Sequence, residues 1–196
     1  MCHALLHDPC FVRLLVRIDQ DLATSAQVAG CGCGGGLHRA DYPRKPRGCA
    51  PALRADFSSR RSFCCALCRK RSTSMSVRFL GRRVYVMLAV VLLSTRSVMR
   101  MPAAAQVASW MRVPQRTLRR WRAWWTQTLV LTPLWLAHVD RFMPVPEALQ
   151  FPSSLLAAFA DQRAPDTPAT PTALLQLMRF LSPWTVPLVI ALDGAR

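Results

Sequence analysis

Cysteines are the residues of this chain whose spacing most directly indicates chemistry. Eight are present, and four of them form two close pairs, Cys31-Gly-Cys33 and Cys65-Ala-Leu-Cys68. Two thiolate pairs separated by a long loop supply the four ligands of a tetrahedral structural Zn²⁺ site, with no open position for substrate or water. The sequence therefore predicts that a structural Zn²⁺ ion binds to Cys31, Cys33, Cys65 and Cys68.

The ligand set has alternatives, because the first pair reads C-x-C where a zinc ribbon usually has C-x-x-C. One of the four ligands could be replaced by Cys64, Cys49 or His38. Alternatively, Cys64 and Cys65 are small buried residues on a strand at 62–65, and the glycine-rich run after Cys31 is only a flexible loop. The negative charge of a thiolate site would be offset by the residues after the last cysteine, Arg69, Lys70 and Arg71.

Catalytic chemistry is poorly supported by the remaining polar residues. The chain has ten Asp and Glu in all, and Glu147 is the single Glu. Two-metal strand cleavage needs several carboxylates on an α/β domain, and the residues after Trp125 are too few for such a domain. Tyr42 and Tyr85, the two tyrosines, lie in a Pro/Arg loop and an apolar helix. We therefore expect no enzymatic activity and no small-molecule substrate.

Positive charge is concentrated in the middle of the chain. The formal net charge is +16, and the window from Arg39 to Arg122 holds 20 Lys and Arg against two Asp, so it carries +18 while the remainder carries −2. Such a basic segment favours a polyanionic partner, above all nucleic acid. Apolar residues make up 52% of the chain, which is enough for a folded core and excludes a fully disordered basic tail.

A helix-turn-helix is predicted inside the basic segment. The apolar run at 84–93 predicts a central buried helix, and 103–111 a short second helix. Pro114 is expected at the first position of the following helix, where its missing N–H costs nothing. The side chains expected to pack inward from that helix follow at helical spacing: Leu118, Trp121 and Trp125.

The opposite face of that helix carries side chains suited to DNA, since Arg reads guanine and Gln pairs with adenine. On this face and in the turn before it we place Arg112, Gln115, Arg116, Thr117, Arg119 and Arg120. The loop between the cysteine pairs supplies a second set for phosphate or minor-groove contact, namely Arg44, Lys45 and Arg47. The alternatives are a solvated connecting loop and an ordinary amphipathic helix with solvated cations.

The order of these motifs resembles uncharacterised bacterial proteins associated with insertion sequences and transposases. The resemblance covers about residues 31 to 125 and rests on the cysteine motifs and on the segments 37–48, 63–71, 76–85 and 117–125. It implies a zinc-ribbon-like segment followed by a helix-turn-helix, as at the front ends of transposases. It also implies sequence-specific binding of duplex DNA by a mobile-element accessory factor or a regulator of similar build.

These patterns together predict a mainly α protein in four segments. They are an N-terminal helical or poorly ordered segment (1–29), a small zinc-ribbon-like β module (30–76), a helix-turn-helix domain (77–127) and a Pro-rich helical extension (128–196). Within the extension we expect helices at 153–161 and 172–181 and a linker at 164–171. Their apolar faces should pack on this chain's own core, with homodimerisation or docking to a transposase as the alternative.

No transmembrane segment is expected. The uncharged run between Arg83 and Arg96 is shorter than the ~20 residues that a bilayer core requires, and the run at 123–139 contains polar residues and Pro133. Charges within the first 21 residues leave no signal-peptide core. We therefore expect a cytoplasmic, nucleoid-associated protein. The alternative function is a non-catalytic interaction protein, peripheral to a membrane, with no specific role on nucleic acid.

Overall fold

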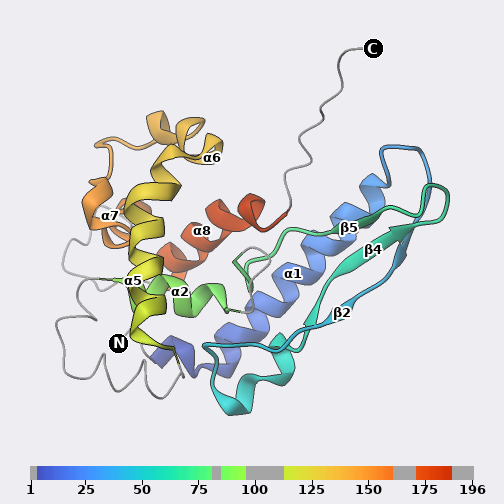
Figure 1. Cartoon of the computed structure of the whole chain (residues 1–196), viewed down its shortest axis with the longest axis horizontal. Coiled ribbons are helices and arrows are strands. Elements are labelled where there is room, and N and C mark those ends of the chain that lie inside the picture. Colours follow the sequence, from blue (N-terminus) through green and yellow to red (C-terminus); the bar gives the residue numbers. More distant parts are fainter. Residues whose placement is uncertain (1–3, 81–84, 96–112, 161–170, 187–196) are drawn as a thin grey trace.

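Helices dominate the computed structural model, and two small antiparallel sheets lie to one side of them (Figure 1). The structure describes residues 4–80, 85–95, 113–160 and 171–186. The expectation of a mainly α protein is confirmed. The predicted helix at 103–111, together with Arg112, lies outside the described residues.

The longest helix, α1 (Pro9–Ala29), forms the N-terminal segment after a short 3-10 turn, η1 (Ala4–Leu6). The carboxylate of Asp8 caps α1 by accepting a hydrogen bond from the Cys10 N–H at 2.8 Å, and Pro9 occupies the first turn. One face of the helix buries Phe11, Val12, Leu15 and Ile18. Gly30 ends the helix with φ +74°, a conformation that favours glycine.

Three strands form the larger sheet beside α1. They are β1 (Leu37–Arg39), β4 (Ser62–Cys65) and β5 (Arg71–Thr73), in the antiparallel order β1-β4-β5. Leu37 pairs with Cys65. On the inner face of the sheet, these two side chains and Phe63 form a buried cluster with Ala23 of α1. His38 pairs with Cys64 on the outer face.

A two-stranded ribbon continues this sheet towards the centre of the molecule. It pairs β2 (Tyr42–Pro43) with β3 (Ser59–Arg60), and the two strands are joined through the 3-10 turns η2 (Pro51–Leu53) and η3 (Ala55–Phe57). Each turn buries one apolar side chain, Leu53 or Phe57, in the main core. The ribbon therefore connects the cysteine-bearing end of the sheet to the helical body.

The centre of the molecule is α2 (Met87–Ser94), in which every residue is buried. The buried helix predicted at 84–93 is confirmed from Met87 onward, whereas Tyr85 and Val86 are extended and form isolated β-bridges with Arg47 and Phe79. Against α2 packs α5 (Gln115–Ala123), where the Trp121 ring meets the Tyr85 ring edge-on at 4.9 Å. The chain continues into a π-helical turn, η4 (Trp124–Thr128), whose Trp125 is fully buried. Leu118, Trp121 and Trp125 thus pack inward as predicted.

Pro114 differs from its expected position. Its φ of −61° suits a helix, but its ψ of 145° does not, so α5 begins one residue later, at Gln115. Pro114 is the residue that caps the helix, and its carbonyl accepts hydrogen bonds from the N–H groups of Thr117 and Leu118. The proline nitrogen still costs the helix no hydrogen bond.

The C-terminal third consists of short helices packed on the same body. They are η5 (Leu129–Leu131), α6 (Pro133–Leu136), η6 (Val139–Arg141), η7 (Ala148–Gln150), α7 (Ser153–Phe159), α8 (Pro171–Leu181) and η8 (Ser182–Thr185). Helices α7 and α8 confirm the predicted helices at 153–161 and 172–181 to within two residues at each end.

One core joins residues from all four predicted segments. It includes Leu15 of α1, Phe57 of η3, Leu92 of α2 and Leu177 of α8. The apolar faces of α7 and α8 are therefore buried against the rest of the chain. No helix in the described part of the chain is both long enough and apolar enough to cross a membrane.

A buried ion pair ties α1 to the segment that follows β5. The Asp19 carboxylate accepts hydrogen bonds from the Ser76 hydroxyl (2.6 Å), the Val77 N–H (2.7 Å) and the Arg78 Nε–H (2.8 Å). Arg78 also donates to the carbonyls of Asp56 and Ser59. Both charges are therefore fully partnered inside the protein, as buried charges require.

Candidate metal centre and basic surface

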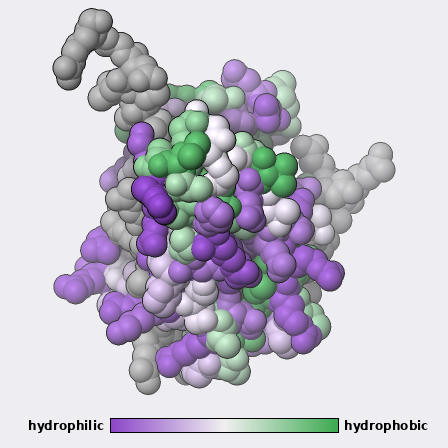
Figure 2. Space-filling view, turned by 90° about the vertical axis from the view of Figure 1, so that its right-hand side faces the viewer, coloured by the Kyte–Doolittle hydropathy of each residue, from purple (hydrophilic) through white to green (hydrophobic). Residues whose placement is uncertain are grey.

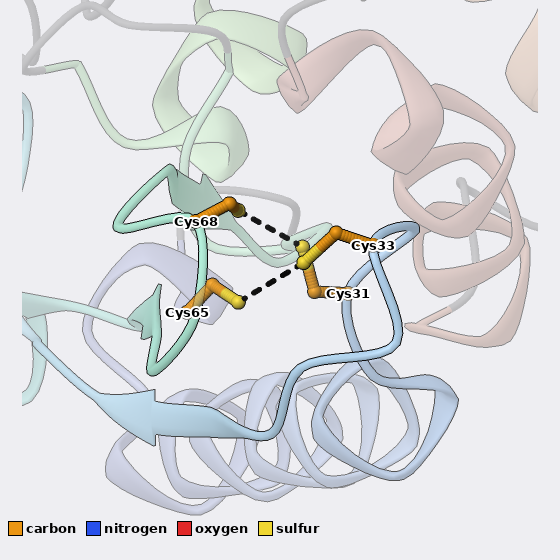
Figure 3. A group of neighbouring side chains, drawn as sticks. All are labelled: Cys31, Cys33, Cys65 and Cys68. Carbon is orange, nitrogen blue, oxygen red and sulfur yellow. Dashed lines mark hydrogen bonds between the residues drawn. The ribbon is translucent and has the colours of Figure 1, made fainter.

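The four predicted cysteine ligands come together at the end of the sheet. Their sulfur atoms all lie within 4.8 Å of one another. Cys31 Sγ lies 3.6 Å from Cys68 Sγ, and Cys33 Sγ lies 3.5 Å from Cys65 Sγ (Figure 3). A disulfide would require about 2.05 Å, whereas four thiolates at about 2.3 Å from one ion lie about 3.8 Å apart. The spacing is therefore that of a metal site, and these four cysteines could hold a metal ion.

The first pair of cysteines stands on a tight loop between α1 and β1. The Gly34 N–H bonds to the Cys31 carbonyl at 2.8 Å, and the Cys31 N–H bonds to the Gly35 carbonyl at 3.2 Å. A β-carbon on Gly35 would approach Cys65 Sγ to 2.5 Å, closer than real contacts allow. Only glycine at this position lets the two cysteine loops meet.

The second pair stands on the turn from β4 to β5, facing the first loop (Figure 3). The Arg69 N–H bonds to the Cys65 carbonyl at 3.2 Å and the Cys65 N–H bonds to the Lys70 carbonyl at 3.0 Å, so this turn is closed by its own backbone. The Ala66 N–H donates to the Gly36 carbonyl at 2.9 Å and thereby holds the two loops together. The cluster geometry is thus set by the backbone.

Backbone N–H groups and the crowding of thiols perturb the acidity of the cluster. The Gly35 N–H, with help from the neighbouring thiols, lowers the pKa of Cys33 to about 6. The Cys68 N–H lowers the pKa of Cys65 against the effect of burial. The Lys70 N–H lowers the pKa of Cys68, but the Cys33 thiol, burial and the other two thiols together raise it to about 12. A bound divalent metal ion would offset the charge of four thiolates and favour their formation.

The alternative ligands lie elsewhere. The Cys64 thiol contacts the Arg69 carbonyl at 3.6 Å, and His38 is exposed on the outer face of the sheet. Cys49 packs against the main core, where burial raises its pKa. The strand predicted at 62–65 is also confirmed, because β4 spans those residues. Cys65 belongs both to this strand and to the cysteine cluster.

The basic loop between the cysteine pairs is anchored to the helical body. The guanidinium of Arg44 lies 5.1 Å from the centre of the Tyr42 ring and donates to its hydroxyl at 3.3 Å. Lys45 and Arg47 are exposed. The Arg47 carbonyl accepts a hydrogen bond from the Val86 N–H at 3.0 Å, immediately before α2. Two of the three predicted contact residues therefore present their side chains to solvent, and Arg44 is half-buried.

The exposed face of α5 carries four of the side chains predicted to contact DNA, and they are Gln115, Arg116, Arg119 and Arg120. Thr117 does not lie on this face. It is 4% exposed and sits beside Leu118 on the side of the helix that packs inward. One side of α5 packs on the core and the other faces solvent. Thr117 lies on the packed side with Leu118 and Trp121.

The basic loop and α5 are neighbours in space although they are far apart in sequence (Figure 1). At the end of the loop, a β-carbon on Gly48 would lie 3.0 Å from Ala89 Cβ of α2 and 3.8 Å from Val113 Cγ2. Val113 is two residues before the first residue of α5. The two sets of basic residues therefore stand on adjoining elements that pack on the same helix.

Two arginines of the basic segment, Arg60 and Arg78, have a structural role that the sequence did not predict. Arg60 is 1% exposed and donates to the Ser74 carbonyl at 2.7 Å, and Arg78 pairs with Asp19. A signal for the pair was present, because Asp19 interrupts the apolar stripe of α1 one residue after Ile18. Arg60 had no such signal, since its other partner, Thr185, is distant in sequence.

Comparisons with known proteins do not assign the chain to a family. It matches no protein-family model, no curated protein and no solved structure. The cysteine cluster and the basic surface are therefore the observations that bear on function.

Proposed function

We propose that this chain is a sequence-specific, non-enzymatic DNA-binding protein stabilised by a structural Zn²⁺ ion. The observation that carries the proposal is the placement of two basic elements, the loop at 44–47 and the exposed face of α5, side by side on one buried core. Rigid presentation of cations on adjoining elements suits the regular phosphates of duplex DNA. The protein would act in the cytoplasm, on the nucleoid.

The zinc ion would be held by Cys31, Cys33, Cys65 and Cys68. Four thiolates leave no position open for a substrate, so the ion would have a structural role. The apolar cluster beneath the sheet is small, comprising Ala23, Leu37, Phe63 and Cys65. Such a cluster is too small to hold a three-stranded sheet, and metal binding would supply much of its stability.

On DNA, α5 would act as the recognition helix of a helix-turn-helix. The arginines on its exposed face are suited to guanine edges and phosphates, and Gln115 to adenine. Lys45 and Arg47 would contact phosphates beside it. The resemblance to proteins associated with insertion sequences supports a role as a transposition accessory factor or regulator, with a transposase or a second copy of the chain as its protein partner.

The DNA proposal is tested by selecting bound sequences from a random duplex library and then measuring affinity across a salt series. Arg119→Ala should weaken binding to the selected sequence by about 5- to 150-fold and to unrelated DNA far less. Arg47→Ala should weaken both equally and reduce the slope of log K against log salt by about 0.9. Arg179→Ala removes one exposed charge from α8 and is the matched control.

Two outcomes would contradict this role. The first is that no sequence is enriched and all arginine variants lose binding equally, which would leave only electrostatic adhesion. The second is retention by anionic liposomes without retention by DNA, which would support the peripheral membrane role instead.

The zinc proposal is tested by metal analysis of the purified protein. We expect about one Zn²⁺ per chain, lost in Cys65→Ser and Cys68→Ser. Cys64→Ser is the matched control, because this neighbouring thiol lies outside the cluster. A metal-free protein of unchanged stability, or equal zinc loss in all three variants, would contradict the proposed ligand set.

A further inference from the structure

The turn that carries the second cysteine pair also carries three consecutive cations, Arg69, Lys70 and Arg71. All three are exposed. The ion pairs formed within the described residues use other arginines, namely Arg39, Arg61 and Arg78. The three cations of the turn, which we term the knuckle cations, are therefore not neutralised by any carboxylate in the part of the chain that the structure describes.

The backbone of Arg69 adopts a conformation that is unfavourable for arginine. Its φ is +59°, and among the described residues the others with positive φ are glycines, at positions 30, 34 and 48. A glycine would adopt this turn without the steric cost that a β-carbon imposes. The chain therefore presents a guanidinium at a position where the fold alone would favour glycine. Residues held in such conformations cluster at functional sites.

The surroundings of the knuckle cations suit a polyanion better than an apolar partner. Arg71 stands beside Cys64 and His38 in one row across the outer face of the sheet. Figure 2 views the molecule from the side where the end of the sheet lies; hydrophilic residues cover most of this face, and a group of apolar residues lies in its upper part. Leu67 is the exposed large apolar residue of the turn itself.

A purely local role would be to offset the negative charge of the thiolates. The backbone N–H groups of Gly35, Cys68 and Lys70 already direct their dipoles at the sulfur atoms. The three side chains extend into solvent from this turn. Their exposure leaves them available to a second ligand, and a phosphodiester backbone presents charges at the short, regular spacing that consecutive cations can neutralise.

We propose that the knuckle cations form a second phosphate contact for duplex DNA, separate from the basic loop and α5. This inference rests on the proposed DNA-binding function and extends it. The zinc site would then have two consequences, because it would both stabilise the backbone-closed turn and fix the position of its cations. Contacts of this kind add affinity without sequence preference.

The test is Arg69→Gly in the zinc-loaded full chain, measured by fluorescence anisotropy on the selected duplex and on an unrelated duplex. The variant should bind zinc normally and unfold at the same or a higher temperature, because glycine relieves the backbone cost. Each lost phosphate contact should lower the salt slope by about 0.9, which corresponds to about eightfold weaker binding at 0.1 M salt. Arg69→Gly combined with Lys70→Ala should roughly double the change in slope.

The control is again Arg179→Ala, which removes the same charge from α8 and should change affinity less than twofold. The inference is overturned if Arg69→Gly matches this control, or if it lowers the zinc content while DNA binding is unchanged. A loss of binding in Arg119→Ala without one in Arg69→Gly would refute this inference alone. An absence of salt-dependent DNA binding by the unaltered protein would refute the proposed function as well.

Discussion

The buried pair between Asp19 and Arg78 makes the sharpest prediction about stability. Asp19 is 1% exposed and accepts three hydrogen bonds, one of them from the Arg78 Nε–H. Asp19→Asn preserves the shape of the side chain but removes its charge and replaces one acceptor oxygen with an NH₂ donor. The Arg78 guanidinium would then be a buried cation without a counter-ion. Breaking a buried pair in this way costs about 3–5 kcal/mol.

For a chain of this size, each kcal/mol lowers the unfolding temperature by about 2–4 °C, so we expect a loss of about 10 °C. Circular dichroism during heating and urea titration measures it. The matched control is Asp21→Asn on the exposed side of the same helix, which should change stability by less than about 0.5 kcal/mol.

A second variant separates loss of the pair from loss of packing. Asp19→Leu with Arg78→Met removes both charges and should recover part of the lost stability, although the carbonyls of Asp56 and Ser59 then lack their donor. Equal stability of Asp19→Asn and Asp21→Asn would refute the reasoning, because it would mean that no buried cation is left uncompensated.

Three further predictions follow from the same contacts. Gly35→Ala should abolish stoichiometric zinc binding because its β-carbon would meet the sulfur of Cys65, whereas Gly36→Ala, which has open space around it, should bind zinc normally in the same metal analysis. Arg60→Met should cost about 1–3 kcal/mol in urea unfolding, since the Ser74 carbonyl loses a buried donor, while the half-buried Arg61→Met should cost less than about 1 kcal/mol. Chelation of zinc should abolish hydrogen-exchange protection in β4 but preserve it in α2; unchanged protection of β4 would show that the sheet is stable without metal.

Local sequence patterns were sufficient for several elements of this protein. The apolar run at 84–93 gives the helix Met87–Ser94, the run at 172–181 gives the helix Pro171–Leu181, and the strand at 62–65 is present. Hydrophobic periodicity and the signals that start and end helices and strands act over a few residues. They can therefore be recognised from the sequence alone. The close pairing of cysteines likewise indicated which four would come together, because a tetrahedral thiolate site has few sequence solutions.

The tertiary structure decided which charges are available for function. The basic segment is one block in the sequence, yet its members differ in exposure. Arg60 and Arg78 are buried and form internal hydrogen bonds, while Arg69, Lys70 and Arg71 are exposed. Thr117, one residue from Arg116 in sequence, is buried. These outcomes depend on partners far along the chain, such as Thr185 for Arg60.

The adjacency of the basic loop and α5 has the same origin. No local pattern relates the basic loop to α5, and the two segments adjoin because the chain at Arg47 and Gly48 packs on α2 beside Val113, just before α5. The sequence by itself therefore determined which four cysteines cluster, the helices α2, α5, α7 and α8, and the total charge. Long-range packing determined where that charge is exposed, since burial is a property of the assembled core and not of any single segment.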